Sequence, residues 1–259
     1  WKNTPGRKPL IIKGCRQCGK TFSVLEFARK NYKHTVYLNF FENPDYASVF
    51  SGSLEIDNIV MMLSALLGKD AVFEPGQTIL ILDEIQDCPE ARTALKFFRI
   101  DGRYDVIGTG SLLGVKGYGK EPRSVPVGSE TILEMYPLDF EEYLLARGKV
   151  LLCEEIRSAY EQMEPLPEAL HEEAVELYRE YLIIGGMPAC INAFLKTRSF
   201  LDVPLIQSEI LDNYTADMAK YASNSDSVKI RACYQSIPAQ LAKENKKFQY
   251  KVVQRGGSA

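Results

Sequence analysis

Short apolar runs alternate with amphipathic segments over the first 150 residues of the chain. Runs rich in Leu, Ile, Val and aromatic residues predict strands at residues 9–13, 35–40, 78–84, 104–110 and 131–139. Apolar residues at helical spacing predict helices at residues 21–30, 56–68, 90–99 and 137–148. Because the predicted strands are apolar on both faces and alternate with helices, the pattern indicates an α/β fold. Its mostly parallel, five-stranded sheet would have helices on both faces.

The pattern becomes helical throughout after about residue 150. Helical periodicity recurs in residues 153–163, 168–184, 188–197, 204–222 and 228–244. Gly185 and Gly186 are placed to end one of these helices, and Pro188 is placed to open the next. We therefore predict a core domain over residues 1–149, followed by an α-helical lid over residues 150–242.

Composition and charge are those of a globular protein, with 46% hydrophobic residues, 25% charged residues and a net charge of −3. With so small a net charge, the molecule as a whole is not attracted electrostatically to DNA or anionic lipid. Any contact with either has to be made by a local patch of positive charge. The acidic stretch 154–180 and the basic stretch 243–255 are most simply solvated helix faces. The longest apolar runs, residues 79–82 and 181–184, are far shorter than the roughly 20 residues that cross a bilayer. We therefore expect a cytoplasmic protein without a membrane partner.

The numbers of cysteines and histidines further limit the kinds of active site that the chain can form. Six cysteines are spread too sparsely for a secreted disulfide scaffold, so we expect reduced thiols. Two histidines, His34 and His171, are too few for a His-rich metal site or for conventional Ser/His/Asp catalysis. Lys, Arg, Asp and Glu remain as the candidate groups.

A glycine-rich motif carries the most specific chemistry. Residues 14–21, GCRQCGKT, fit the pattern G-x-x-x-x-G-K-[ST] between a predicted strand and a predicted helix. There, backbone N–H groups and the positive end of the helix dipole can surround a phosphate chain. Lys20 would reach the β- and γ-phosphates, and the Thr21 hydroxyl would ligate Mg²⁺. The structural alternative is a glycine turn before a helix. The predicted nucleotide-binding residues are Gly14, Cys15, Arg16, Gln17, Cys18, Gly19, Lys20, Thr21 and Phe22.

Two of these loop residues also form a C-x-x-C motif. Cys15 and Cys18 would suit a redox pair or half of a zinc site. The chain has no second C-x-x-C and few histidines to complete a tetrahedral site. We expect the nearby Lys20 and the helix N-terminus to lower the thiol pKa, which would make the pair easy to oxidise.

An acidic pair follows the third predicted strand, in TILILDEIQ. Asp83 and Glu84 come at the sheet edge where ligands collect in open α/β folds. Asp83 can hold Mg²⁺, and Glu84 can orient or deprotonate the water that attacks the γ-phosphate. The alternative is a helix-capping Asp with a Glu in the first turn.

Hydroxyl and arginine side chains near the fourth strand are further catalytic candidates. Thr109 and Ser111 end the run DVIGTGSLLG, where they could sense the γ-phosphate or the attacking water. Arg123 is the only arginine between this strand and the next, and it could neutralise a nucleotide on a neighbouring subunit. A polar turn and a surface arginine are the alternatives.

Taken together, these motifs resemble the AAA+ ATPases. Among them, they are similar to prokaryotic predicted ATPases with a C-terminal winged-helix segment and a nuclease-like domain of unknown function. The motifs GCRQCGKT, ILDEIQ, GTGS, YPLDFEEYL and YLIIGGMP stand in the same order, over about residues 7–255. The resemblance implies that GCRQCGKT is Walker A, ILDE is Walker B and GTGS lies in the sensor-1 region. Cys15 and Cys18 depart from the more usual loop residues.

The resemblance also implies that residues 243–259 begin a truncated winged-helix-like segment and that the nuclease-like domain is missing. The chain starts at Trp1 without a Met and ends just after a strand-like stretch, so we expect a fragment. Arg179 and Arg198 flank the turn at residues 185–188, but nothing in the sequence selects either as a sensor-2 arginine.

The expected activity is Mg²⁺-dependent hydrolysis of ATP to ADP and phosphate. One alternative is a slow, nucleotide-gated regulatory or DNA-associated switch, in which ATP is a conformational ligand. A P-loop kinase is a further alternative, although an Asp-Glu pair suits activation of water better than an acceptor hydroxyl. Expected partners are ATP, further copies of the chain, and DNA or a protein bound through the missing C-terminal part.

Overall fold

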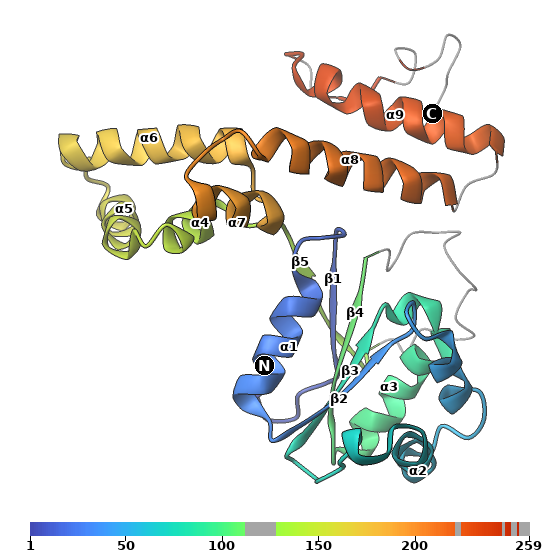
Figure 1. Ribbon diagram of the computed structural model, residues 1–259. Coiled ribbons are helices and arrows are strands. Elements are labelled where there is room, and N and C mark those ends of the chain that lie inside the picture. The colour runs from blue at the N-terminus through green and yellow to red at the C-terminus, as the bar shows by residue number, and fades with distance from the viewer. Residues whose placement is uncertain (112–127, 221–223, 245–246, 250–252, 254–259) are drawn as a thin grey trace. The chain divides into compact units, whose positions relative to one another are not determined.

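The computed structural model describes residues 1–111, 128–220, 224–244, 247–249 and 253 (Figure 1). The chain divides into two compact units, residues 1–195 and 196–259. The whole sheet lies in the first unit. The domain ranges 1–149, 150–242 and 243–259 stay predictions. None of the helices in the described part of the chain is long and apolar enough to cross a membrane.

A five-stranded sheet forms the centre of the first unit, and every strand pair in it is parallel. Its strands, in the spatial order β2-β3-β4-β1-β5, are β1 (Leu10–Gly14), β2 (His34–Asn39), β3 (Thr78–Asp83), β4 (Asp105–Gly110) and β5 (Thr131–Met135). The predicted fold class is therefore confirmed. The fifth strand is shorter than expected, because Pro137 cannot donate to a ladder and the Leu138 N–H bonds to Gly186 instead.

Helices cover both faces of this sheet (Figure 1). On one face α1 (Lys20–Asn31) packs Val24 and Ala28 against Ile12 and Ile81. On the other face α2 (Ile56–Leu67) and α3 (Pro89–Asp101) close a second core around Ile11 and Leu82. Alternate residues of β1, β2, β3 and β4 thus enter opposite cores. Short 3₁₀ turns are η1 (Pro44–Phe50), η2 (Gly68–Asp70) and η3 (Ile85–Asp87).

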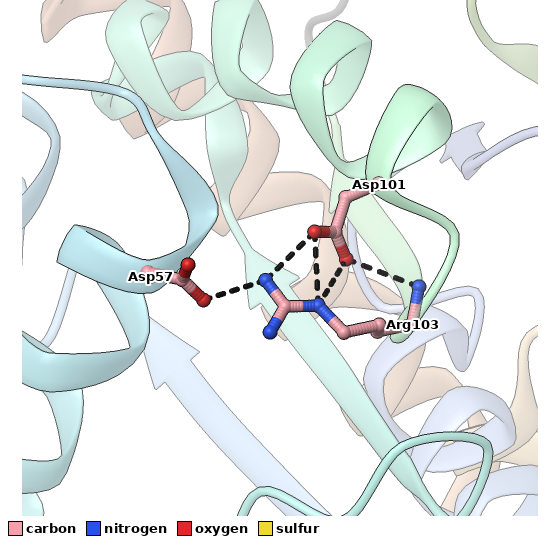
Figure 2. Close-up of polar contacts among 3 residues, drawn as sticks. All are labelled: Asp57, Asp101 and Arg103. Carbon is pink, nitrogen blue, oxygen red and sulfur yellow. Dashed lines mark hydrogen bonds and ion pairs between the residues drawn. The ribbon is translucent and has the colours of Figure 1, made fainter.

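An ionic network ties the two helices of the second layer together. The Arg103 guanidinium lies 2.7 Å from Asp101 at the end of α3 and 2.6 Å from Asp57 on α2. Figure 2 shows how the arginine contacts both carboxylates. Hydrogen bonding to Arg103 lowers the Asp101 pKa below its ordinary value. Arg103 precedes β4, so this network lies at the sheet edge where the strands begin.

After β5, the first unit is helical. It contains α4 (Phe140–Ala146), α5 (Val150–Gln162), α6 (Glu168–Ile184) and most of α7 (Pro188–Thr197). Leu144, Leu152 and Leu177 form its small core. The Glu180 carboxylate on α6 accepts from the Tyr143 hydroxyl and lies 2.9 Å from Arg147. Apolar packing and this polar cluster together hold the helices in place.

The second unit contains α8 (Val203–Lys220) and α9 (Asn224–Leu241). After α9, the Gln249 N–H donates to the Gln240 side chain at 2.6 Å. Much of the predicted winged-helix start, residues 243–259, lies outside the described residues.

Candidate nucleotide-binding site

The parallel sheet brings the predicted motifs to a single edge. The loop 14–21 follows β1, Asp83 ends β3, and Thr109 lies at the end of β4. Since β1 and β3 both pair with β4 in parallel, the carboxyl ends of all three strands meet there. This edge is where open α/β sheets bind ligands.

Close packing explains the first glycine of the loop, and backbone conformation explains the second. A Cβ on Gly14 would lie 2.2 Å from the carbonyl oxygen of Met135 on β5, so only glycine fits there. Gly19 has φ = 97°, a left-handed conformation, immediately before the first residue of α1. The N-terminus of α1 is therefore preceded by a tight turn, as phosphate binding requires.

Lys20 is folded back over the loop. Its ammonium group donates to the carbonyl oxygens of Gly14 at 2.9 Å and Cys15 at 2.7 Å. The side chain is only 7% exposed. The ammonium group is thus held at a place where phosphate oxygens could replace the loop carbonyls as its hydrogen-bond acceptors.

Asp83 is the centre of the site and is 2% exposed. One carboxylate oxygen accepts from the Thr21 hydroxyl at 2.9 Å and the Tyr37 hydroxyl at 2.7 Å. The other accepts from the Thr109 hydroxyl and from the Glu84 N–H. Four donors from the loop and three strand ends thus satisfy one buried carboxylate.

The pair formed by Thr21 and Asp83 fits a magnesium ion. Mg²⁺ takes oxygen ligands and is usually held through one or two carboxylates together with substrate phosphates. A hydroxyl and a carboxylate in direct contact beside Lys20 match that donor set. Within the described ranges there is no group of three or more His, Cys, Asp or Glu side chains that could hold a metal ion. The described structure thus offers no such cluster for a zinc site built on Cys15 and Cys18.

Glu84 lies beside Asp83 in a left-handed conformation, with φ = 52°. Its carboxylate accepts a hydrogen bond from the Gln86 amide. Partial burial and the negative charge of Glu84 raise the pKa of Asp87 above its ordinary value. The positive charge of Arg16 lowers this pKa, but only in part. Carboxyl groups and an arginine thus gather next to the loop.

The structure corrects the expected acidity of the loop cysteines. Burial raises the pKa of Cys18 above its ordinary value, and Lys20 lowers it only in part. The prediction of a lowered pKa is therefore wrong for Cys18. Its thiol is fully buried and lies 3.7 Å from the Met135 carbonyl oxygen.

The remaining predicted residues have different surroundings. The Ser111 hydroxyl is buried without a hydrogen-bond partner among the described residues, whereas the Thr109 hydroxyl is engaged with Asp83. Phe22 is 75% exposed on α1. Arg123 falls outside the described residues, so its role in a neighbouring site stays a prediction.

Sequence reasoning missed three contributors to the site. Tyr37 donates to Asp83, and Asp87 lies beside Glu84. Met135 packs its backbone against Gly14. A signal existed only for Tyr37, because it lies between the apolar residues Val36 and Leu38, and a buried tyrosine hydroxyl usually needs a hydrogen-bond partner.

The turn between α6 and α7 also approaches the loop. A Cβ on Gly19 would lie 3.7 Å from the Pro188 ring. The Gly186 carbonyl oxygen accepts from the Leu138 N–H at 2.8 Å. The GGMP sequence, interpreted above as a helix boundary, thus also places the start of α7 beside the phosphate loop.

Two family descriptions match parts of the chain. The AAA domain matches residues 6–144, and a domain of unknown function (DUF8612) matches residues 175–259. No curated protein matches the chain.

Several solved structures are similar to this chain at low sequence identity. PCH-2 from C. elegans is 12% identical, with a TM-score of 0.40, and the match covers 78% of this chain and 59% of that one. AMPPCP-bound DnaA from Aquifex aeolicus is 13% identical, with a TM-score of 0.43 and coverage of 97% and 77%. ORC2 from Aeropyrum pernix in its ADP form is 15% identical, with a TM-score of 0.35 and coverage of 66% and 62%. At this level of similarity none of the three bears on function.

The family match and the site geometry agree. The AAA domain match covers more than half of the 259-residue chain and includes β1, the phosphate loop, Asp83 and Thr109. The sheet order and the helices on both faces are those of a P-loop ATPase of the AAA+ type. This chain belongs to the AAA domain family.

Proposed function

We propose that this protein binds ATP with Mg²⁺ and hydrolyses it to ADP and phosphate. The observation that carries the proposal is the 2.9 Å hydrogen bond from the Thr21 hydroxyl to the Asp83 carboxylate. It joins the residue after the phosphate-binding lysine to the acidic end of β3. A glycine turn with no ligand would not need a buried carboxylate there.

Each side chain has a distinct role in this proposal. Lys20 would exchange its two carbonyl partners for the β- and γ-phosphate oxygens, assisted by the N–H groups of the loop. Thr21 and Asp83 would hold Mg²⁺. The bound metal supplies charge neutralisation at the phosphate oxygens. Glu84 would accept a proton from the attacking water, and Ser111 could contact the γ-phosphate or that water.

The two acidic residues can be separated by experiment. We expect Glu84→Gln to bind ATP and Mg²⁺ but to release phosphate at least about 10²-fold more slowly, because the amide is not a base. Asp83→Asn should instead weaken the Mg²⁺-dependent part of ATP binding. Glu74→Gln, which removes a carboxylate before the start of β3, is the control. Binding and phosphate release are measured together, and parental turnover in both site variants would contradict the assignment.

The contact between Gln86 and Glu84 favours a second candidate, a slow nucleotide-gated switch. The Gln86 amide occupies an oxygen of the carboxylate that would otherwise accept from the attacking water. ATP would then act mainly as a conformational ligand. Single-turnover hydrolysis compared with binding distinguishes the two functions, since a switch binds tightly but releases phosphate slowly.

The resemblance extends the proposal to partners. It implies assembly with further copies of the chain, with Arg123 acting on a neighbour's nucleotide. It also implies a winged-helix segment beginning at residues 243–259 and a DNA or protein partner bound beyond it. The cytoplasmic location stays a prediction. If DNA is the partner, its binding to the full-length protein should weaken steeply with salt, because phosphate contacts release counterions.

A further inference from the structure

Two thiols flank a turn inside the phosphate loop. Residues 16 and 17 form the turn, so Cys15 and Cys18 are its first and fourth residues. The Cα atoms at the ends of such a turn lie within about 7 Å of each other. A disulfide joins Cα atoms roughly 4.4–6.8 Å apart. The backbone therefore already holds the two cysteines at a spacing close to that of a disulfide.

The two thiols differ in their access to solvent. Cys18 is fully buried against the Met135 carbonyl oxygen, whereas Cys15 is partly exposed. The Cys15 thiol is also close enough to raise the pKa of Cys18. Elsewhere, Cys88, Cys153 and Cys190 are buried, and Cys233 lies in the second unit. The loop thus combines an accessible thiol with a protected one.

We propose that Cys15 and Cys18 form a reversible disulfide under oxidising conditions and that this bond prevents nucleotide binding. The inference rests on the proposed function, because the loop that it would close is the proposed ATP site. The disulfide would give the C-x-x-C motif a function separate from ATP hydrolysis.

The chemistry requires an oxidant, and a peroxide is sufficient. Cys15, the accessible thiol, would attack hydrogen peroxide, forming a sulfenic acid and releasing water. The Cys18 sulfur would then attack the Cys15 sulfur, forming the S–S bond and expelling a second water. Two thiols and one peroxide thus give one disulfide and two waters. A dithiol reductant reverses the step by exchange.

The disulfide would act on the loop by fixing its backbone. Once it is part of the disulfide, the Cys18 sulfur has no proton to donate to the Met135 carbonyl oxygen. The carbonyl of Cys15 also accepts from Lys20, so a covalent tie at this residue restrains the lysine's partner as well. Phosphate binding needs the loop N–H groups and Lys20 to turn toward the ligand together. A cross-linked turn would oppose that adjustment.

The test follows the bond and its effect separately. Trypsin cuts after Arg16, so the disulfide would appear as residues 14–16 joined to residues 17–20, a pair that dithiothreitol separates. We expect peroxide treatment to produce this pair and to weaken binding of a fluorescent ATP analogue at least about 10-fold. Dithiothreitol should restore both readouts.

Variants identify the thiols that are responsible. In Cys15→Ser the affinity should be the same before and after peroxide, whatever its value in the reduced protein. Cys233→Ser, in the other unit, should keep the full response. Reduced protein that fails to bind the analogue would contradict the proposed function. Reduced protein that binds it but yields no joined peptides, or binds equally well after oxidation, would overturn the switch.

Discussion

At the residue scale, the site depends on a single buried carboxylate that collects donors from the phosphate loop and the neighbouring strands. Asp83 accepts from Thr21, Tyr37 and Thr109, and each donor is supplied by a different element. An unsatisfied buried carboxylate would be costly, so these hydroxyls stabilise the fold as well as positioning the metal-binding oxygens.

Tyr37→Phe tests the part that sequence reasoning missed. Loss of a hydrogen bond to a charged group should lower the free energy of unfolding by about 1.5–3 kcal/mol and weaken Mg²⁺-dependent ATP binding. Tyr32→Phe is a matched control, because its hydroxyl donates to Asp105 at the opposite sheet edge, at the same 2.7 Å. That control should lose stability and keep its affinity. Urea unfolding and nucleotide titration supply the two readouts, and equal affinity losses would contradict a local role for Tyr37.

Sequence reasoning found the loop, Asp83 and Glu84 because each belongs to a contiguous motif. It did not find Tyr37 or Met135, since their roles arise from strand pairing between residues far apart in the chain. It also assigned the wrong direction to the Cys18 pKa. The spacing shows a nearby lysine, but burial against β5, which decides the shift, depends on the fold.

At the element scale, short linkers hold the helices in place. The segment between β5 and α4 bonds to the turn between α6 and α7 through Leu138 and Gly186. The Tyr181 hydroxyl on α6 donates to the Leu138 carbonyl oxygen at 2.9 Å. The start of α7 is consequently held beside the phosphate loop.

Gly186→Ala should disturb this arrangement. The added Cβ would lie 2.2 Å from the Leu138 carbonyl oxygen, so the turn has to open, at a cost of about 1–3 kcal/mol in unfolding free energy. Gly52→Ala is the control, since no atom lies within 4 Å of its Cβ. Thermal unfolding should show a lower Tm only for Gly186→Ala. Equal Tm values would mean that the turn is not packed as described.

The Arg103 network in Figure 2 makes a pH-dependent contribution. The Asp101 pKa is lowered on folding, so its stabilisation is present above the ordinary value of 3.8 and is lost as pH falls through the folded value. Asp101→Asn should therefore be less stable than the parent at pH 7, by an amount that shrinks below pH 3.8. Asp57→Asn should lose less, because that side chain is 83% exposed. Urea unfolding across this pH range measures the difference, and a gap independent of pH would contradict the assignment.

At the scale of the whole molecule, the alternation of apolar runs and helices was sufficient to predict the sheet and its layers. It did not indicate where the compact units divide. The pattern becomes helical near residue 150, but α5 and α6 belong with the sheet in the first unit. A backbone hydrogen bond between Leu138 and Gly186 attaches these helices to the segment after β5, and hydrophobic periodicity does not reveal such a bond.

The central claim is that the loop 14–21 binds the phosphates of ATP, and Lys20→Ala tests it most directly. Without the ammonium, the loop N–H groups cannot neutralise the β- and γ-phosphate oxygens, so binding should fall by at least about 10²-fold. Lys30→Ala, an exposed lysine on the same helix, should bind like the parent. The measurement is calorimetric titration of both variants with ATP and Mg²⁺ under reducing conditions. Loss of binding in Lys20→Ala alone is the predicted result, and parental affinity in that variant would contradict the account.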